Sequence, residues 1–147
     1  MTLLTPKVRV ELEWLGDEDL KVRFSSRAFD DLAITKSRVP PEERGGEARE
    51  LLAASAVECM ATMLLYLLKK VRVDLQGLRA AAEVTAGKDE EGNLCVEAID
   101  VTIRAGVPGD DEARNRFERV RTILQKGCLI SRSLERGVHV RYDISTL

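Results

Sequence analysis

Apolar and charged residues alternate at the start of the chain. The apolar positions are Val8, Val10, Leu12 and Trp14, then Leu20, Val22 and Phe24. Because alternation with a period of two is typical of a strand with one buried face, the pattern predicts an N-terminal hairpin that turns at Gly16–Asp19. A third short strand is expected around Leu32 and Ile34. The breakers Pro40-Pro41 and Gly45-Gly46 follow, and we expect a mobile loop there.

The longest apolar stretch of the chain predicts one long helix, from about Glu47 to Lys70. No residue in it interrupts helix propensity, and Lys69 and Lys70 place positive charge at its carboxyl end. The stretch is apolar nearly all round, so we expect it to be the buried spine of the fold. The segment Leu51–Leu68 is also almost long enough to cross a membrane, but Glu58 at its middle argues against that.

The second half of the sequence predicts a β meander, two helices and a closing strand. The extended segments, joined by a turn at Asp89–Asn93, are 71–75, 78–85 and 94–104. Phe117, Val120 and Leu124 mark one face of a helix that ends at Gly127, and a shorter helix is expected over Leu129–Arg136. Alternation from Val138 to Ile144 predicts the last strand. The element order indicates an α+β fold in a single domain, residues 1–147.

Composition and charge exclude several classes of protein. The chain has 147 residues, of which 44% are hydrophobic, so it can build a core without disulfides or metal. Its 25 acidic and 23 basic side chains nearly cancel, and acidic residues interleave with the arginines between positions 114 and 121. We therefore expect no nucleic-acid partner. No export leader precedes the first strand, and three cysteines without zinc-type spacing indicate a reducing compartment, so a cytoplasmic location is expected.

Two of the cysteines are candidates for chemistry. Cys59 lies deep in the long helix, about 18 Å from its start, beyond the reach of the helix dipole. Cys128 precedes a short helix, whose free N–H groups can favour a thiolate. This asymmetry suits a redox pair in which Cys128 acts as the resolving or leaving thiol. Cys59 would need a cationic or hydrogen-bonding neighbour to become reactive.

The residues around both cysteines resemble motifs of the OsmC/Ohr superfamily of peroxide-detoxifying proteins. The run Glu50-Leu-Leu-Ala-Ala-Ser-Ala-Val-Glu-Cys59 is similar to the family's helix before the peroxidatic cysteine. The run Cys128-Leu-Ile-Ser-Arg-Ser-Leu134 is similar to the family's Cys-Pro-x-Ser-x-x-Leu. The order of elements agrees over nearly the whole chain.

The resemblance implies an intertwined homodimer with antioxidant activity in the oxidative stress response. In such an enzyme Cys59 would attack an organic hydroperoxide and Cys128 would resolve the sulfenic acid as a disulfide. No bound cofactor is implied, and an external dithiol or a lipoylated protein would restore the thiols. The alternative is an OsmC-like dimer without catalysis, which binds an apolar or sulfur-containing small molecule and in which Cys59 is structural.

The sequence departs from the hydroperoxide-resistance branch at the catalytic carboxylate. The family's Glu lies ten residues before the peroxidatic cysteine, where this chain has Arg49, and Glu50 follows one residue later. Glu50 is the candidate catalytic carboxylate, although nine residues place it about 180° round a straight helix from Cys59. The family's activating arginine has four candidates, which are Arg27, Arg38, Arg44 and Arg49. Leu129 replaces the family's Pro.

The remaining polar and sulfur-containing residues have simpler interpretations. Glu58 either pairs with Arg49 or Arg44, within the chain or across a dimer, or reaches solvent. Cys95 is expected in the core of a strand, and His139 on the polar face of the last strand. Side chains close to Cys59, namely Met60, Met63 and Tyr66, are expected to pack the core or to line an apolar pocket.

Overall fold

The computed structural model describes residues 7–147, which divide into two compact units. The boundary between the units lies between Ala48 and Arg49. Residues 1–6, on which the expectation of a missing export leader partly rested, lie outside the described residues. The prediction of a single domain over residues 1–147 stays a prediction.

The first unit is a three-stranded antiparallel sheet in the order β1-β2-β3. Its strands are β1 (Val10–Gly16), β2 (Asp19–Phe24) and β3 (Leu32–Ile34). The hairpin turns through Gly16 and Asp17, both with positive φ, which confirms the turn predicted there. The expected loop after β3 contains two short 3₁₀ helices, η1 (Lys36–Arg38) and η2 (Pro41–Glu43).

The loop after β3 is tied to the sheet through Asp19. The Asp19 carboxylate accepts hydrogen bonds from Ser37 Oγ at 2.5 Å and from the Ser37 backbone N–H at 2.9 Å. These bonds lower the pKa of Asp19 below its usual value. Arg44, near the end of the loop, donates to the Val39 carbonyl and pairs with Glu18 at 3.2 Å. The segment is thus more ordered than its breakers suggested.

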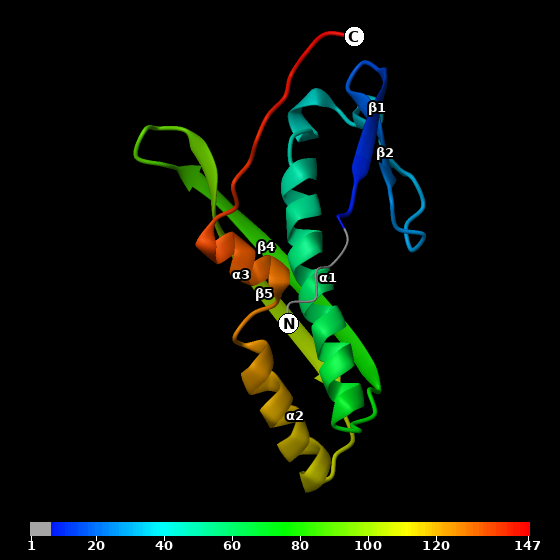
Figure 1. Ribbon diagram of the computed structural model, residues 1–147, viewed down its shortest axis with the longest axis vertical. Coiled ribbons are helices and arrows are strands. Elements are labelled where there is room, and N and C mark those ends of the chain that lie inside the picture. The colour runs from blue at the N-terminus through cyan, green and yellow to red at the C-terminus, as the bar shows by residue number, and fades with distance from the viewer. Residues whose placement is uncertain (1–6) are drawn as a thin grey trace. The chain divides into compact units, whose positions relative to one another are not determined.

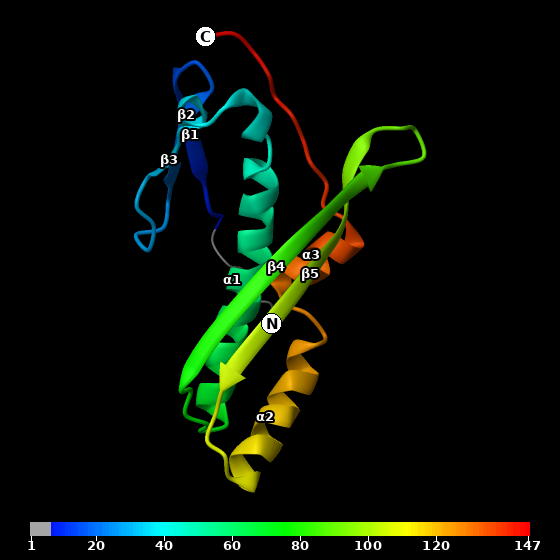
Figure 2. The same ribbon diagram turned by 180° about the vertical axis from the view of Figure 1, so that it is seen from behind.

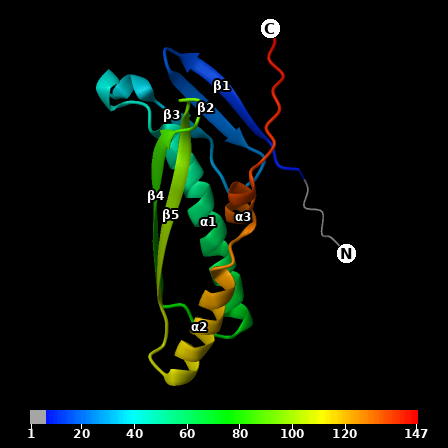
Figure 3. The ribbon, with the colours of Figure 1, turned by 90° about the vertical axis from the view of Figure 1, so that its left-hand side faces the viewer.

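The second unit consists of a long hairpin and three helices (Figure 1). Its elements are α1 (Glu47–Lys70), β4 (Gly77–Lys88), β5 (Leu94–Gly106), α2 (Asp111–Leu124) and α3 (Leu129–Arg136). The three helices lie on the same side of the β4–β5 ribbon (Figures 2 and 3). The bounds of α1 and α3 match the prediction. Residues 71–75, expected to be extended, form a turn and an irregular connection, with Arg72 at positive φ.

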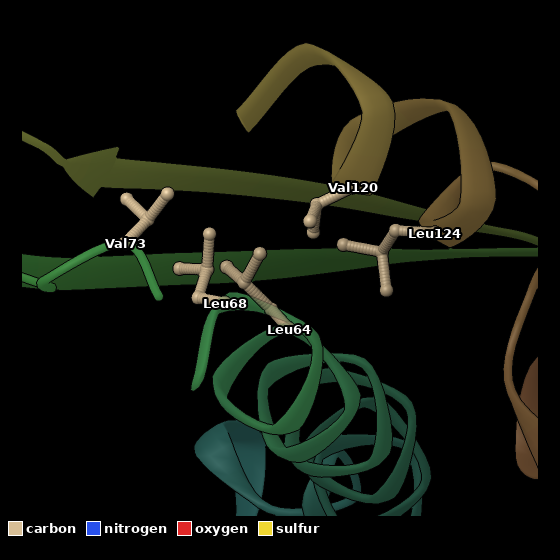
Figure 4. Close-up of a cluster of buried hydrophobic side chains, with 5 residues drawn as sticks. All are labelled: Leu64, Leu68, Val73, Val120 and Leu124. Carbon is tan, nitrogen blue, oxygen red and sulfur yellow. The ribbon is translucent and has the colours of Figure 1, made fainter. Parts of the chain in front are cut away.

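The core of the second unit joins α1, α2 and the connection after α1. Figure 4 shows Leu64 and Leu68 of α1 facing Val120 and Leu124 of α2, with Val73 beside them. Leu64, Leu68 and Val120 are each 1% exposed. Met60 and Met63 pack against this cluster, which confirms their predicted role. Tyr66 is exposed instead, and the Lys70 ammonium lies 5.3 Å from its ring centre.

Three sequence predictions are wrong for the described chain. The long helix α1 is not buried all round, because only Ala56, Leu64 and Leu68 are buried and Leu65 is half-exposed. Residues 138–147 form no strand, since no strand edge pairs with them. Cys95 is exposed on β5 rather than packed in a core.

The α1 helix is long and apolar enough to cross a membrane by length and composition alone. The core helix of a soluble protein passes the same test. Here Leu64 and Leu68 pack against α2, and Met60 lines the same core, so the apolar residues of α1 serve protein packing. This packing agrees with the sequence-based interpretation, in which Glu58 at the middle of the helix argues against a membrane span.

Candidate thiol site

Cys59 and Cys128 come together where α1 meets the start of α3. The two thiols lie close enough for each to shift the pKa of the other, and the backbone N–H of Ile130 shifts both pKa values. Cys59 is half-buried and Cys128 is 3% exposed. Both thiols are free. The structure brings the two cysteines together within one chain, and their role as a redox pair stays a prediction.

Cys128 caps the amino end of α3. Its sulfur accepts a hydrogen bond from the Ser131 backbone N–H at 3.5 Å, and its own N–H donates to Ser131 Oγ at 2.8 Å. These reciprocal contacts form a capping box. The structure thus confirms the expectation that Cys128 faces free N–H groups at the start of α3.

The surroundings shift the pKa values of the two thiols in opposite directions. Burial raises the pKa of Cys59. The neighbouring Cys128 and the negative charge of Glu58 raise this pKa further, whereas the Ile130 N–H lowers it. For Cys128 burial also acts upward, but hydrogen bonds from the Ser131 side chain and backbone, then from Cys59, leave its pKa below the ordinary value. The surroundings therefore favour the thiolate form of Cys128 over that of Cys59.

Glu50 lies on the same helix as Cys59 but far along it. Since α1 begins at Glu47, the nine residues between them correspond to about 13.5 Å of helix rise on opposite faces. The two side chains do not meet within one chain. The catalytic role of Glu50 stays a prediction.

The candidate activating arginines lie before or at the start of α1. Arg44 already has the Val39 carbonyl and Glu18 as partners, and Arg38 lowers the pKa of Asp19 after the larger effects of Ser37. Arg27 is exposed. The choice among these three and Arg49 stays open, as it was from the sequence.

Glu58 is exposed and accepts a hydrogen bond from Thr62 Oγ at 2.7 Å. A bridge to Arg49 within the same helix is excluded, because nine residues again separate the two positions by about 13.5 Å. The Glu58 side chain therefore reaches solvent, which is the second of the two alternatives that the sequence left open. A bridge across a dimer stays a prediction.

A cavity of about 420 Å³ opens beside the thiol pair, between α1, β5 and α3. Its apolar wall includes Leu52, Ala56, Ile99 and Leu134. Ser131, which caps Cys128, is also part of the lining, so the cavity and the thiol site share a side chain. Met60, Met63 and Tyr66, which the sequence predicts either in the core or along an apolar pocket, do not line this cavity. The lining instead comes from the preceding turns of α1 and from β5.

The other charged residues that the sequence singles out lie outside this site. Two of the four arginines of α2 form ion pairs on its surface, Arg116 with Glu112 and Arg121 with Glu118. This confirms the prediction of a solvated helix face. His139 is exposed, as expected, although the strand predicted around it is not formed. Among the described residues no cluster of three His, Cys, Asp or Glu side chains could hold a metal ion.

The structure is similar to solved OsmC-like proteins. The OsmC-like protein of Vibrio cholerae matches with a TM-score of 0.70 at 15% identity, over 89% of this chain and 95% of that chain. The OsmC-like protein of Mycoplasma pneumoniae matches with a TM-score of 0.68 at 10% identity, over 90% and 89%. An organic hydroperoxide resistance protein of Elizabethkingia anophelis matches with 0.52 at 18% identity, over 90% and 89%. At these identities the likeness shows the fold.

Sequence comparison gives the family. No protein with a curated description matches the chain. The family model of OsmC-like proteins matches residues 41–143, which include both cysteines, the cavity and the core of the second unit. The chain belongs to the family of OsmC-like proteins.

Proposed function

We propose that this protein is a thiol-dependent peroxidase that reduces organic hydroperoxides through Cys59 and Cys128. The Cys59 thiolate attacks the terminal oxygen of ROOH, so the O–O bond breaks, Cys59 becomes a sulfenic acid and the alkoxide leaves as ROH after protonation. The Cys128 thiolate then attacks the Cys59 sulfur, which forms the disulfide and releases hydroxide, protonated to water. An external dithiol or lipoyl-type reductant takes up the oxidising equivalents and restores both thiols.

The observation that supports this proposal is the proximity of two free thiols whose pKa values shift in opposite directions. A resolving thiol must lie within reach of the first sulfur and be ionised when the sulfenic acid forms. Cys128 suits both needs, because it lies near Cys59 and its capping box with Ser131 lowers its pKa. The OsmC-like fold and neighbours named as hydroperoxide resistance proteins support the same chemistry.

Activation of Cys59 needs a further charge. Burial and the neighbouring negative groups keep its pKa above the ordinary value in a single chain. One of the four candidate arginines, Arg27, Arg38, Arg44 or Arg49, supplies the cation in this proposal, and Glu50 of a second copy orients it. An ion pair of this kind would lower the pKa of Cys59 and favour the attacking thiolate.

A homodimer is part of the same proposal. Trp14 on β1 is 68% exposed and Tyr142 near the carboxyl terminus is 80% exposed, and both belong to alternating apolar rows. On α1, Leu65 is also half-exposed. A second copy would cover such surfaces and offer the segment 138–147 a strand edge. We place the dimer in the cytoplasm, where dithiol reductants keep the cysteines reduced.

Three proteins test the proposal, namely the wild type, Cys59→Ser and Cys128→Ser. Each is assayed for consumption of an alkyl hydroperoxide and of hydrogen peroxide with dihydrolipoamide as the donor. We expect the wild type to turn over, Cys59→Ser to be inactive, and Cys128→Ser to react once and then stall. Cys95→Ser serves as the matched control, because Cys95 is exposed and distant in sequence from both. Equal rates in all four proteins would refute the peroxidase.

The second candidate function is non-catalytic binding of an apolar small molecule. The raised pKa of Cys59 and the cavity beside it favour this alternative. It predicts that Cys59→Ser binds such a molecule as tightly as the wild type does. It also predicts that hydroperoxide leaves both cysteines reduced.

A further inference from the structure

The outer face of the β4–β5 ribbon is left uncovered by the helices of the second unit, which lie on its other side (Figures 2 and 3). Leu78, Ile103 and Ala105 point to the helices, because they pack against the core of that unit. Successive residues of a strand leave on opposite faces. Arg79 and Arg104 therefore lie on the outer face, where both are exposed.

Two rows of like charge cross this outer face. Arg79 pairs with Arg104 and forms the basic row. Four positions further along β4, Glu83 pairs with Asp100 and forms the acidic row, and both of these residues are exposed as well. Like charges directly opposite each other destabilise a strand pair, so each row makes the single chain less stable.

Neither row has a compensating partner within one chain. Strands rise by about 3.4 Å per residue, so the basic row and the acidic row lie about 14 Å apart. Among the residues that the structure describes, no side-chain hydrogen bond or ion pair is made by Arg79, Arg104, Glu83 or Asp100. The four charges are therefore open to a group outside the chain.

Small side chains lie midway between the two charged rows. Ala81 pairs with Thr102 there, two residues from each charged row, and both are exposed on the same face. We call this pair the small row. Side chains of this size let another backbone approach the ribbon, so that the longer charged side chains on either side can reach across to it.

We propose that a second copy of this chain docks on this face through a two-fold contact centred on the small row. The two-fold axis lies parallel to the face and across the strands, so the strands of the second copy run in the reverse direction. The basic row of each copy then lies opposite the acidic row of the other. Each charge that is uncompensated in one chain gains a partner of opposite sign, and the alternation of sign fixes the register of the contact.

The charge pattern favours a second copy over other occupants. A nucleic acid or an anionic membrane would be attracted by the basic row but repelled by the acidic row beside it. Exposed ion pairs contribute little each, so the contact is weak and sensitive to salt. It uses neither thiol and none of the apolar row between Val138 and Ile144, so it goes beyond the proposed function and does not depend on it.

Charge reversal of one row at a time tests the contact. In sedimentation equilibrium at about 0.02 M salt, Arg79→Glu with Arg104→Glu, and Glu83→Arg with Asp100→Arg, should each show an average mass about twofold below the wild type. Both double variants keep a like-charged pair across the ladder, so the stability of the single chain changes little. An equimolar mixture of the two should recover the wild-type mass, because an acidic face then meets a basic one.

Two controls accompany these variants. Arg114→Glu with Arg119→Glu, at exposed positions of α2, changes the net charge equally and should keep the wild-type mass. Raising the salt to about 1 M, where the screening length is about 3 Å, should lower the mass of the wild type about twofold. A wild-type mass equal to that of the reversed variants, or a mixture that does not recover it, would overturn the inference.

Cross-linking tests the two-fold register. In a chain whose three cysteines are replaced by Ser, Thr102→Cys should be joined to its copy by a short bifunctional maleimide, because position 102 lies beside the axis. Thr85→Cys, exposed on the same face, is the control, since position 85 lies about 14 Å from the axis in each copy. Equal cross-linking at both positions would overturn this register. None of these readouts involves turnover, so they decide the contact whether or not the protein reduces hydroperoxides.

Discussion

The Ser131 backbone N–H donates to Cys128 Sγ at 3.5 Å while Ser131 Oγ accepts from the Cys128 N–H at 2.8 Å. A thiol held as a helix cap is stabilised as a thiolate by the N–H groups that face it. Cys59 has no such position, because it lies in the middle of α1. The two cysteines are thus differentiated by where each lies in its helix, before any second chain is considered.

Replacing Ser131 by Ala should raise the pKa of Cys128 and destabilise α3 by about 1 kcal/mol, because the capping box loses the hydrogen bond that Ser131 Oγ accepts from the Cys128 N–H. The pKa is measured from thiolate absorbance at 240 nm in a Cys59→Ser, Cys95→Ser background. Ser133→Ala is the matched control, since Ser133 Oγ donates to the Leu129 carbonyl on the same helix. An unchanged Cys128 titration in Ser131→Ala would contradict the capping role.

Replacing Ser131 by Ala should also lower the free energy of unfolding by an amount that depends on pH. The folded pKa of Cys128 is lowered, so ionisation of this thiol stabilises the fold above the pKa of the unfolded chain, and the gain disappears as pH falls through the folded pKa. The stability difference between wild type and Ser131→Ala therefore widens as the pH rises from about 7 to 10. Urea unfolding at several pH values measures it. A difference that stays constant with pH would show that ionisation plays no part.

Much of the fold could be predicted because its signals are local. The α3 helix ends at Gly137, and the α2 helix begins after the Asp110 side chain, which accepts from the Ala113 N–H at 2.8 Å. Such caps are visible in the sequence. The strand predicted from Val138 to Ile144 failed because a strand also needs a neighbouring edge, which the pattern of one segment does not specify.

The candidate site was predictable only in part. The pairing of Cys59 with Cys128 followed from the motifs around them, but the β-bulge that makes Glu97, in the cavity lining, an extra residue of β5 was missed. A signal for it exists, because the apolar positions of β5 change from even numbers at Leu94 and Val96 to odd numbers at Ile99 and Val101. The cross-strand register, in which Gly87 pairs with Cys95, cannot be derived from the sequence pattern alone.

Truncation of the core should test the packing of the second unit. Leu64→Ala should lower the free energy of unfolding by about 2–5 kcal/mol, because Leu64 is 1% exposed among Leu68, Val120 and Leu124. Chemical denaturation measures the loss. Arg119→Ala on the exposed face of α2 is the control and should change stability by less than about 0.5 kcal/mol. Similar losses in both variants would contradict the described core.

If the proposed dimer pairs through one face of the carboxyl-terminal segment, substitutions on that face should weaken the dimer and substitutions on the other face should not. Val140→Ser with Tyr142→Ser removes the apolar row and should shift the protein toward the 16.4 kDa monomer in sedimentation equilibrium. His139→Ser with Arg141→Ser changes the alternate positions and should leave the dimer intact. Equal weakening by the two double variants would contradict pairing through one face.

The activation of Cys59 can be assigned by substitution of the candidate groups. Arg27→Met, Arg38→Met, Arg44→Met and Arg49→Met are compared for the rate of the first oxidation step, together with Glu50→Gln. We expect one arginine variant to slow this step by at least about 100-fold, since it removes the charge that favours the thiolate. The other three serve as its controls. Five rates equal to the wild type would leave Cys59 without an activating cation and contradict this part of the mechanism.

The central claim, that Cys59 and Cys128 form a redox pair, is tested most directly by the mass of the protein after one equivalent of an alkyl hydroperoxide. The wild type should lose two hydrogens, and digestion should yield the peptides of Cys59 and Cys128 joined by a disulfide. Cys128→Ser should instead gain one oxygen as the Cys59 sulfenic acid. An unchanged wild-type mass, or a disulfide that involves Cys95, would contradict the account.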